Sequence, residues 1–337
     1  MTHTLCERLD KHERGGSTWA AEFEYRWHVR MGVLDIGSNT VHLLLVDAHY
    51  GAAPIPASKL KIPLRLAEHL TPEGNVDDEA VETLLEFIRK SQNLAEDLGV
   101  SELMAFATSA IRDAGNGVNV LNRVMDETGI QVEVLSGEDE ARMTFLAVRR
   151  WFGWSAGRLL VVDIGGGSLE LASGIDEEPD VAVSLPLGAG RLTRAYLHND
   201  PPTADEIRKL RKYVRASIAG VVGKMHRGGV PSIAVGSSKT LKQLARIAGA
   251  PSSSDGQFVD RELTLAAVKR LVIQLSVLTI SERALIPGVS EGRAEQMLAG
   301  AIVAEAAMEL LGIDVVSICP WALREGVILQ RMDGLPR

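Results

Sequence analysis

The tripeptide Asp-Ile-Gly occurs twice, at residues 35–37 and 163–165, and this repeat constrains the fold more than any other feature. Each copy follows an apolar run, residues 32–36 and 159–164, and each precedes a second apolar run. Apolar runs on both sides of a short turn rich in glycine, serine and asparagine are typical of β-hairpins. Because the same strand–turn–strand pattern recurs at the scale of a domain, the sequence predicts two lobes of similar topology that face each other.

The rest of the chain alternates between predicted strands and predicted helices. The spacing of apolar residues predicts strands at 103–107, 131–135, 169–172, 181–185, 232–235 and 315–318. It predicts helices at 77–98, 117–127, 136–151, 239–248, 262–279, 290–311 and 323–330. Strands that alternate with helices indicate an α/β layer architecture. A ligand is then expected in the cleft between the two lobes.

The chain length of 337 residues suits two domains. We expect residues 1–30 to be a disordered N-terminal extension, because they are polar and lack the apolar core of a signal peptide. Met31 opens directly onto a strand and is an alternative translation start. The first lobe is assigned to residues 31–144, the second lobe to residues 145–331, and a short tail to residues 332–337.

Composition excludes several classes of function. The net charge of −8 argues against general nucleic-acid binding, although a local basic groove could still attract a polyanion. No apolar stretch of about 18 residues occurs, so no membrane span is expected. The two cysteines, Cys6 and Cys319, are far apart in the sequence, which makes a disulfide framework or a zinc site unlikely to be the basis of the fold. We therefore expect a cytoplasmic protein that works in a reducing compartment.

The two Asp-Ile-Gly turns are candidate phosphate sites. Small residues let backbone N–H groups approach an anion closely, and such turns form concave anion sites. The aspartates at the ends of the strands, Asp35 and Asp163, would repel a phosphate directly but could hold Mg²⁺ beside it. The residues expected to bind phosphate in these turns are Gly37, Ser38, Asn39, Gly165, Gly166, Gly167 and Ser168. A dinucleotide-binding turn does not fit, because GxGxxG is absent and the residues after Ser168 continue as a strand.

A third turn, Gly236, Ser237, Ser238 and Lys239, lies between a predicted strand and a predicted helix. The free N–H groups at the start of a helix favour an anion there. An ordinary strand–helix turn explains the same residues equally well, so both interpretations stay open.

Three further features have a structural and a chemical interpretation. Arg112 follows a predicted strand and could grip phosphate from the cleft, or could be a solvated arginine. Glu140 lies near the start of the helix that begins at Ser136, where capping explains the neighbouring acids but leaves a role as catalytic base open. The basic residues within 208–215 are expected to form a solvated helix face, with the path of a long anion as the alternative.

Taken together and in order, five motifs resemble the exopolyphosphatase/guanosine pentaphosphate phosphohydrolase family. They occupy residues 35–40, 136–142, 163–170, 236–240 and 322–326. The resemblance covers about residues 31–331 and is closest to the short actinobacterial members. It implies the actin-like ATPase fold, which duplicates a ribonuclease H-like unit into two lobes with a cleft between them.

The resemblance also implies roles for residues. Glu140 is similar to the family's catalytic glutamate, which orients or deprotonates the attacking water, and Arg112 to an arginine that grips phosphate. Asp163 and Glu170 are similar to acidic positions near a Mg²⁺ ion, for which Mn²⁺ is an alternative. The implied substrate is inorganic polyphosphate, cleaved at its terminal phosphate, and a homodimer is the implied assembly.

Two departures from the family pattern stand out. Longer members carry a helical C-terminal portion with an HD-type domain, and this sequence has no His-Asp dipeptide, so processivity on very long chains is not expected. Lys239 stands where many members have glycine. A cation there would add grip on phosphate or would block a nucleoside.

Three alternatives remain at this stage. Hydrolysis of pppGpp uses the same chemistry, and the sequence separates it poorly from exopolyphosphatase activity. A sugar or acetate kinase of the same fold would need an adenosine pocket, which the crowded turn around Lys239 does not favour. A non-catalytic polyphosphate or nucleotide sensor is disfavoured by the presence of Glu140.

Overall fold

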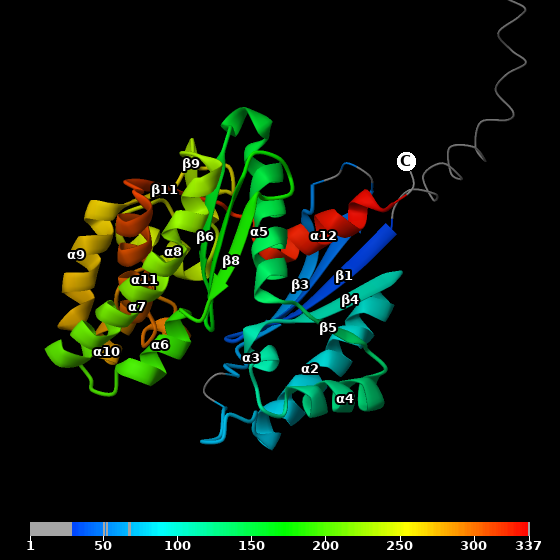
Figure 1. Cartoon of the computed structure of the whole chain (residues 1–337). Helices are drawn as coiled ribbons and strands as arrows, with labels where there is room; N and C mark the ends of the chain where they lie inside the picture. The colour runs from blue at the N-terminus through cyan, green and yellow to red at the C-terminus, as the bar shows by residue number, and fades with distance from the viewer. Residues whose placement is uncertain (1–28, 50, 52, 67–68, 336–337) are drawn as a thin grey trace, which may run out of the picture.

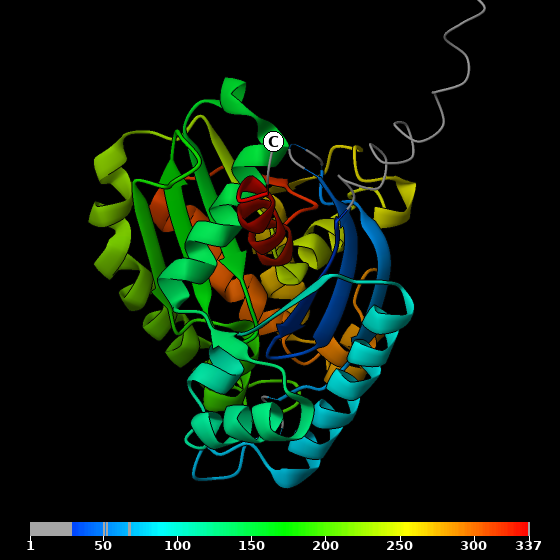
Figure 2. The same ribbon diagram turned by 90° about the vertical axis from the view of Figure 1, so that its right-hand side faces the viewer.

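The computed structural model describes residues 29–49, 51, 53–66 and 69–335. Two β-sheets, each covered by helices, form two lobes, and the helices α5 (Gly137–Phe152) and α12 (Leu323–Asp333) lie between them (Figures 1 and 2). The expected extension lies outside the described residues up to position 28. Residues 29 and 30 differ from that expectation, because they form the start of the first strand.

The first sheet has the strand order β3-β2-β1-β4-β5. β1, β2 and β3 are antiparallel neighbours, whereas β4 and β5 run parallel to β1. β3 was not expected from the sequence, because its alternating lysines and small residues make an exposed edge strand. The strands span Val29–Ile36 (β1), Val41–Ala48 (β2), Pro56–Ile62 (β3), Glu102–Ala107 (β4) and Val132–Val134 (β5).

The second sheet repeats this order as β8-β7-β6-β9-β11 and adds β10 beside β11. β6, β7 and β8 are again antiparallel neighbours, and β9 and β11 again run parallel to β6. The repeated order confirms the expected α/β fold of actin-like, duplicated ribonuclease H-like type. The strands span Leu159–Ile164 (β6), Leu169–Gly174 (β7), Val181–Leu185 (β8), Ile233–Gly236 (β9), Glu262–Thr264 (β10) and Val315–Ile318 (β11).

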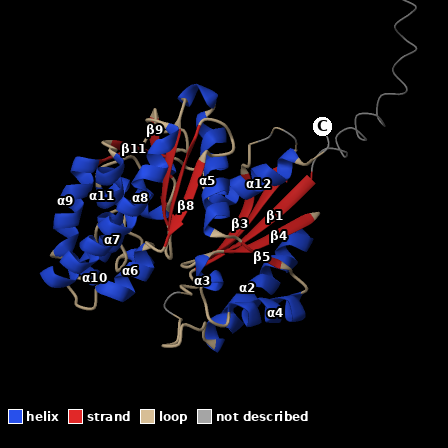
Figure 3. Cartoon of the chain, viewed as in Figure 1, coloured by secondary structure: helices blue, strands red, loops and turns tan. Residues whose placement is uncertain are grey.

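Helices cover the outer face of each sheet (Figure 3). On the first sheet these are α2 (Asp78–Asp97) and α4 (Gly117–Thr128), whose apolar faces join the core formed with β1, β2 and β4. The larger core of the second lobe lies under α6 (Ala189–Tyr196), α7 (Ala204–Met225), α8 (Lys239–Ile247), α9 (Leu265–Ser276) and α11 (Met297–Leu311). Short helices α3 (Ser109–Arg112) and α10 (Ile280–Ala284) complete the set.

Two expected helices are wrong at their starts. The segment expected to be helical over 262–279 begins as strand β10, and α9 starts at Leu265, where the Thr264 side chain caps it. The segment expected over 290–311 enters its α-helix at Met297. Nothing within the described residues forms a helix that is long and apolar enough to cross a membrane.

The two helices between the lobes, α5 and α12, divide the chain differently from the expected boundaries. The boundary between residues 144 and 145 falls inside α5, a continuous helix whose Phe145 and Val148 pack on the second sheet. The end of the chain returns to the first lobe, because Ile328 and Met332 of α12 pack against β1 and β2. The tail expected at 332–337 therefore begins, in its described part, as the last turn of α12.

Gly326 permits the contact between these two helices. A Cβ atom at Gly326 would lie 1.9 Å from the carbonyl oxygen of Met143, so the backbones of α12 and α5 touch at this position. A residue with any side chain would force the helices apart.

Candidate active site

Each of the two Asp-Ile-Gly turns is closed by an equivalent backbone hydrogen bond. The N–H of Gly37 donates to the carbonyl of Thr40 at 3.1 Å, and the N–H of Gly165 donates to the carbonyl of Ser168 at 2.9 Å. The repeat in the sequence is thus a repeat of backbone geometry. Because these two N–H groups close the turns, they are not the donors that would face an anion, which corrects that part of the expectation for Gly37 and Gly165.

The aspartates occupy the same position in the two hairpins but have different partners. Asp35 pairs across the strands with His42, and Asp163 pairs with Glu170. Cross-strand partners lie on the same face of a sheet, so Glu170 lies beside Asp163. In the first hairpin the position equivalent to Glu170 is occupied by His42, whose Nε2 lies 2.9 Å from Thr40 Oγ1 in a hydrogen bond. Burial and neighbouring cations lower the pKa of His42 to about 3, so its ring is neutral.

The tips of the two turns lie in contact. A Cβ atom on Gly166 would lie 2.6 Å from Asn39 Nδ2 and 2.9 Å from Ser38 Cβ, and one on Gly167 would lie 2.2 Å from Ser109 Oγ. Only glycine allows this approach at both positions. The structure therefore brings the two expected phosphate turns together, although they belong to different lobes.

Two side-chain hydrogen bonds order the first turn. Ser38 Oγ lies 3.1 Å from Ser109 Oγ. Asn39 Oδ1 accepts a hydrogen bond of 2.8 Å from Nε2 of Gln296, a buried residue that immediately precedes α11. With its oxygen used in this way, Asn39 presents its amide hydrogens as donors.

Arg112 of α3 and Glu140 of α5 form an ion pair. Arg112 Nη1 donates to Glu140 Oε1 and, at 2.7 Å, to the carbonyl oxygen of Leu135. The position of Glu140 follows from the helix start, because Ser136 caps α5 by accepting from the N–H of Asp139. The two expected catalytic residues are thus in direct contact.

Glu140 is buried, with 7% of its surface exposed, in spite of its charge. Burial raises the pKa of Glu140 to about 7, against the opposing effect of Arg112, and the carboxylates of Asp35 and Asp163 raise it further. A carboxylate that titrates near neutrality can accept a proton at physiological pH.

The three expected metal ligands are also shielded acids, since Glu170 is buried and Asp35 and Asp163 are partly buried. Burial raises the pKa of Asp35 to about 6 and raises the pKa of Asp163. Burial, together with Glu140 and Asp163, raises the pKa of Glu170 well above its usual range. Ser237 Oγ donates to Asp163 at 2.5 Å, and Ser184 Oγ donates to Glu170 at 2.9 Å.

These acids fit a hard divalent cation. Their donors are all oxygen, and the nearby cation Arg324 has its Nε 3.9 Å from Asp35 Oδ2. Within the described residues, no three His, Cys, Asp or Glu side chains are close enough to hold a metal by themselves. Mg²⁺ normally binds through one or two carboxylates and completes its shell with water and substrate phosphate, so one or two of these acids would suffice to hold it.

The third turn lies next to Asp163. Ser237 contacts Asp163 directly, whereas Ser238 caps α8 by accepting from the N–H of Leu241 at 3.2 Å. Gly236 serves packing, since a Cβ atom there would lie 2.8 Å from Leu241 Cδ1. Lys239 has no carboxylate within 4 Å among the described residues.

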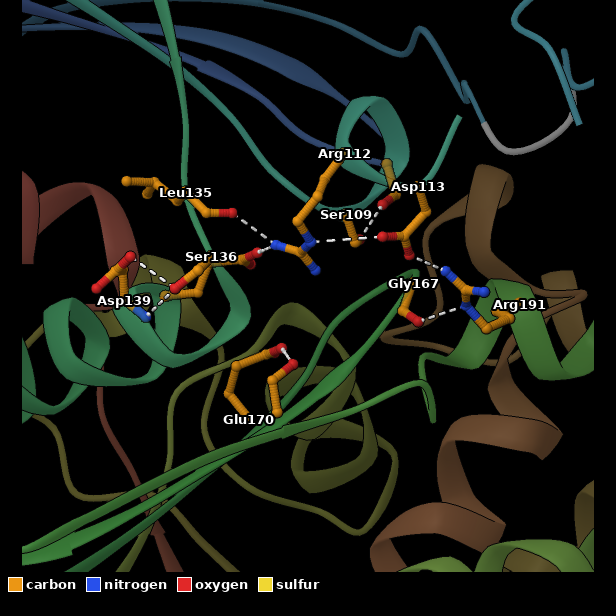
Figure 4. A network of polar contacts seen from close by, with 12 residues as sticks. Ser109, Arg112, Asp113, Leu135, Ser136, Asp139, Gly167, Glu170 and Arg191 are labelled. Carbon is orange, nitrogen blue, oxygen red and sulfur yellow. Dashed lines mark hydrogen bonds and ion pairs between the residues drawn. The ribbon is translucent and has the colours of Figure 1, made fainter. Parts of the chain in front are cut away.

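Sequence reasoning missed Arg191 and Asp113, which join the lobes. Arg191 Nε donates to the carbonyl oxygen of Gly167 at 2.8 Å, and its guanidinium forms an ion pair with Asp113 (Figure 4). Asp113 Oδ1 lies 3.4 Å from Arg112 Nε. The only available signal was the position of Asp113 next to Arg112, because nothing in the local sequence marks Arg191.

The basic residues of α7 that the sequence singled out form ion pairs on the surface of the helix. Arg208 and Lys209 both pair with Asp205, whereas Arg211 and Arg215 pair with the α11 acids Glu305 and Glu309. The alternative role in guiding a long anion is therefore not supported.

Similarity to known proteins agrees with this geometry. The model of the Ppx/GppA phosphatase family matches residues 45–334. Exopolyphosphatase 1 of Mycobacterium tuberculosis is 52% identical over 306 residues, which cover 91% of this chain and 89% of that protein. Exopolyphosphatase 1 of Mycobacterium leprae is 51% identical over 306 residues, which cover 91% of this chain and 90% of that protein.

Solved structures give the same result. An exopolyphosphatase from Cytophaga hutchinsonii superposes with a TM-score of 0.81 at 27% identity, covering 91% of this chain and 99% of that chain. The Ppx/GppA family member from Aquifex aeolicus superposes with a TM-score of 0.76 at 26% identity, covering 90% and 97%. The chain described here belongs to the Ppx/GppA phosphatase family.

Proposed function

We propose that this protein is an exopolyphosphatase, which hydrolyses the terminal phosphoanhydride bond of inorganic polyphosphate and releases orthophosphate. The observation that supports this most strongly is the ion pair between buried Glu140 and partly buried Arg112, which lies beside two glycine turns that touch across the lobes. The names of the mycobacterial relatives agree with it.

The terminal phosphate is held by the turns. The N–H groups of Gly166 and Gly167 make no backbone hydrogen bond in the described part of the chain, so they are available to an anion. The hydroxyls of Ser38 and Ser168 and the amide of Asn39 add side-chain donors. These groups fix the phosphorus atom for in-line attack, and positioning supplies much of the catalysis in phosphoryl transfer.

Water is activated by Glu140, whose carboxylate accepts a proton as the oxygen attacks phosphorus. Arg112 holds Glu140 through Nη1 and has further N–H groups for the phosphoryl oxygens, where negative charge develops. The leaving group is the shortened polyphosphate chain.

One or two of the acids Asp35, Asp163 and Glu170 would hold Mg²⁺, with Mn²⁺ as the alternative, and water and substrate phosphate would complete the shell. The bound ion would neutralise phosphate charge near the attacked bond. The protein is further proposed to be cytoplasmic and to form a homodimer, whose second copy would extend the binding groove. A monomer by light scattering at the assay concentration would refute the dimer.

Orthophosphate release in the presence of Mg²⁺ tests the proposal, with tripolyphosphate, long-chain polyphosphate and pppGpp compared in parallel. A higher kcat/KM for polyphosphate would support the exopolyphosphatase. A higher kcat/KM for pppGpp would retain the fold and Glu140 but would assign the site to a nucleotide. Absence of turnover on all three substrates would remove the function altogether.

A further inference from the structure

A basic pocket lies next to the third turn in the second lobe. Its volume is about 460 Å³, and it is formed between α8, the segment that follows α8, and the residues around Pro320. The cations that line it are Lys239, Lys242, Arg246 and Arg261. None of the described residues that line the pocket is an aspartate, a glutamate or an aromatic residue.

The pocket follows one stripe of α8. Lys239, Lys242, Gln243 and Arg246 recur at spacings of three and four residues, which places them on one side of the helix. The opposite side, which includes Leu241 and Leu244, is buried in the core. From Lys239 to Arg246 the helix rises about 10 Å, so the stripe is an extended row of positive charge.

These cations form no direct ion pair with a carboxylate among the described residues, although Glu325 and Asp163 lie near enough to Lys242 to act on it electrostatically. In the described part of the chain none of the four has an acidic side chain within 4 Å, and the bonds that they make go to neutral carbonyl groups. Lys242 Nζ donates to Pro320 at 2.9 Å, and Arg246 Nη1 donates to Ala250 at 2.8 Å. This contrasts with α7, where the cations are paired with acids. Unpaired cations in a partly enclosed pocket attract an anion strongly.

The row begins at the reaction centre. Lys239 directly follows Ser238 and Ser237, and Ser237 contacts Asp163, one of the acids beside the phosphate turns. The row of cations therefore begins near the acids beside the glycine turns.

We propose that this pocket is a subsite for the distal phosphates of a linear polyphosphate, so that the substrate leaves the reaction centre along α8. The proposal rests on the proposed function. A nucleoside is not favoured, because binding of a base commonly uses an aromatic surface for stacking and the pocket has none. The pocket would contribute to binding only for chains long enough to pass Lys239.

The test compares the steady-state kinetics of Arg246→Gln with those of the wild type on tripolyphosphate and on polyphosphate of about 15 and about 45 units. Arg246→Gln is expected to raise KM at least fivefold for the two longer substrates and less than twofold for tripolyphosphate, with kcat changed less than twofold. Arg246→Lys keeps the charge and should stay within twofold of the wild type. Lys212→Gln removes an exposed cation of α7 and is the matched control.

Three outcomes would overturn the subsite. First, KM in Arg246→Gln could rise equally for all chain lengths. Second, KM could stay unchanged for all chain lengths. Third, Arg246→Lys could behave like Arg246→Gln, which would show a structural role of the bond to Ala250. Competition by ATP that is lost in Arg246→Gln, with no length-dependent KM, would assign the pocket to a nucleotide. In each of these cases the proposed function still holds if the wild type hydrolyses polyphosphate. If the wild type does not hydrolyse polyphosphate, the proposed function itself is wrong.

Discussion

Arg191 of the second lobe forms an ion pair with Asp113 of the first lobe, and the same guanidinium holds the carbonyl oxygen of Gly167 in a phosphate turn. Since Asp113 also lies beside Arg112, a continuous set of polar contacts runs from one phosphate turn to the pair that contains Glu140. The contact between the lobes and the position of the proposed catalytic pair are thereby connected.

Asp113→Asn should lower kcat/KM several-fold, because it weakens the contact across the lobes while leaving each lobe folded. Ion pairs as exposed as this one contribute about 0–1 kcal/mol to stability, so Tm should change little. Asp180→Asn is the control, because it removes the acid of the Arg158–Asp180 pair within one lobe. Equal losses in both variants would contradict a specific role for Asp113.

Glu140→Gln should lower kcat by a factor of about 10² to 10⁴, the usual contribution of a general base, with KM within about threefold of the wild type. Glu138→Gln, two residues earlier in the same helical turn and exposed, should keep full turnover. Near-normal kcat in Glu140→Gln would remove Glu140 from the mechanism.

Activity should rise with pH through about 7. The pKa of Glu140 is raised to about 7 by burial, and a base acts only when deprotonated, so turnover is lost as the pH falls below that value. A profile of kcat/KM from pH 5.5 to 8.5 should show an acidic limb, and the residual activity of Glu140→Gln should lack it. A limb that persists unchanged in the variant would belong to another group.

Removal of metal should destabilise the protein most at high pH. The folded-state pKa values of Asp35, about 6, and Glu140, about 7, lie above unfolded values of roughly 4. Their contribution to stability is therefore complete below the unfolded values and is lost as the pH rises through 6 and 7. A bound divalent cation would offset the resulting repulsion.

Thermal melts with EDTA and with Mg²⁺ measure this effect. The increase in Tm on adding Mg²⁺ should be larger at pH 8 than at pH 5.5, and it should fall by half or more in Asp163→Asn. Asp126→Asn changes an exposed acid on α4 and should leave the increase as in the wild type. An increase that is independent of pH and of Asp163 would place the ion elsewhere.

Gly166→Ala should reduce kcat/KM at least tenfold, because its Cβ atom would lie 2.6 Å from Asn39 Nδ2 and would push the turns apart. Gly220→Ala in α7 is a matched control, since a Cβ atom there has no neighbour within 4 Å. It should leave activity unchanged and increase the free energy of unfolding by roughly 0.5–1 kcal/mol, the propensity difference between the residues in a helix. Full activity in Gly166→Ala would mean that the turns need not touch.

The fold could be predicted because its signals are local. The strand–turn–strand pattern around residues 35–37 and 163–165 depends on neighbouring residues, and both hairpins form as expected. Edge strands β3 and β10 were missed, because one is exposed and rich in lysine and the other has only three residues before a helix cap. The return of α12 to the first lobe is set by tertiary packing, which the local pattern does not record.

The site could be predicted only where one residue type at one position carries the chemistry. Glu140 and Arg112 were assigned separately, and the structure places them in contact. Arg191 and Gln296 were not found, because an arginine and a glutamine acquire their roles here from contacts with Gly167 and Asn39 in distant parts of the chain.

The contact between Gly326 and Met143 also determines how the molecule can open. The chain enters the second lobe through α5 and leaves it through α12, so the two lobes are tethered at two adjacent points. Two domains joined at two adjacent points are expected to move by a hinge rotation about an axis through those points, and other relative rotations are restricted. Glu140 lies three residues before Met143 on α5, the helix that carries this contact. Opening about this axis would separate the two glycine turns, because they belong to different lobes and touch at their tips.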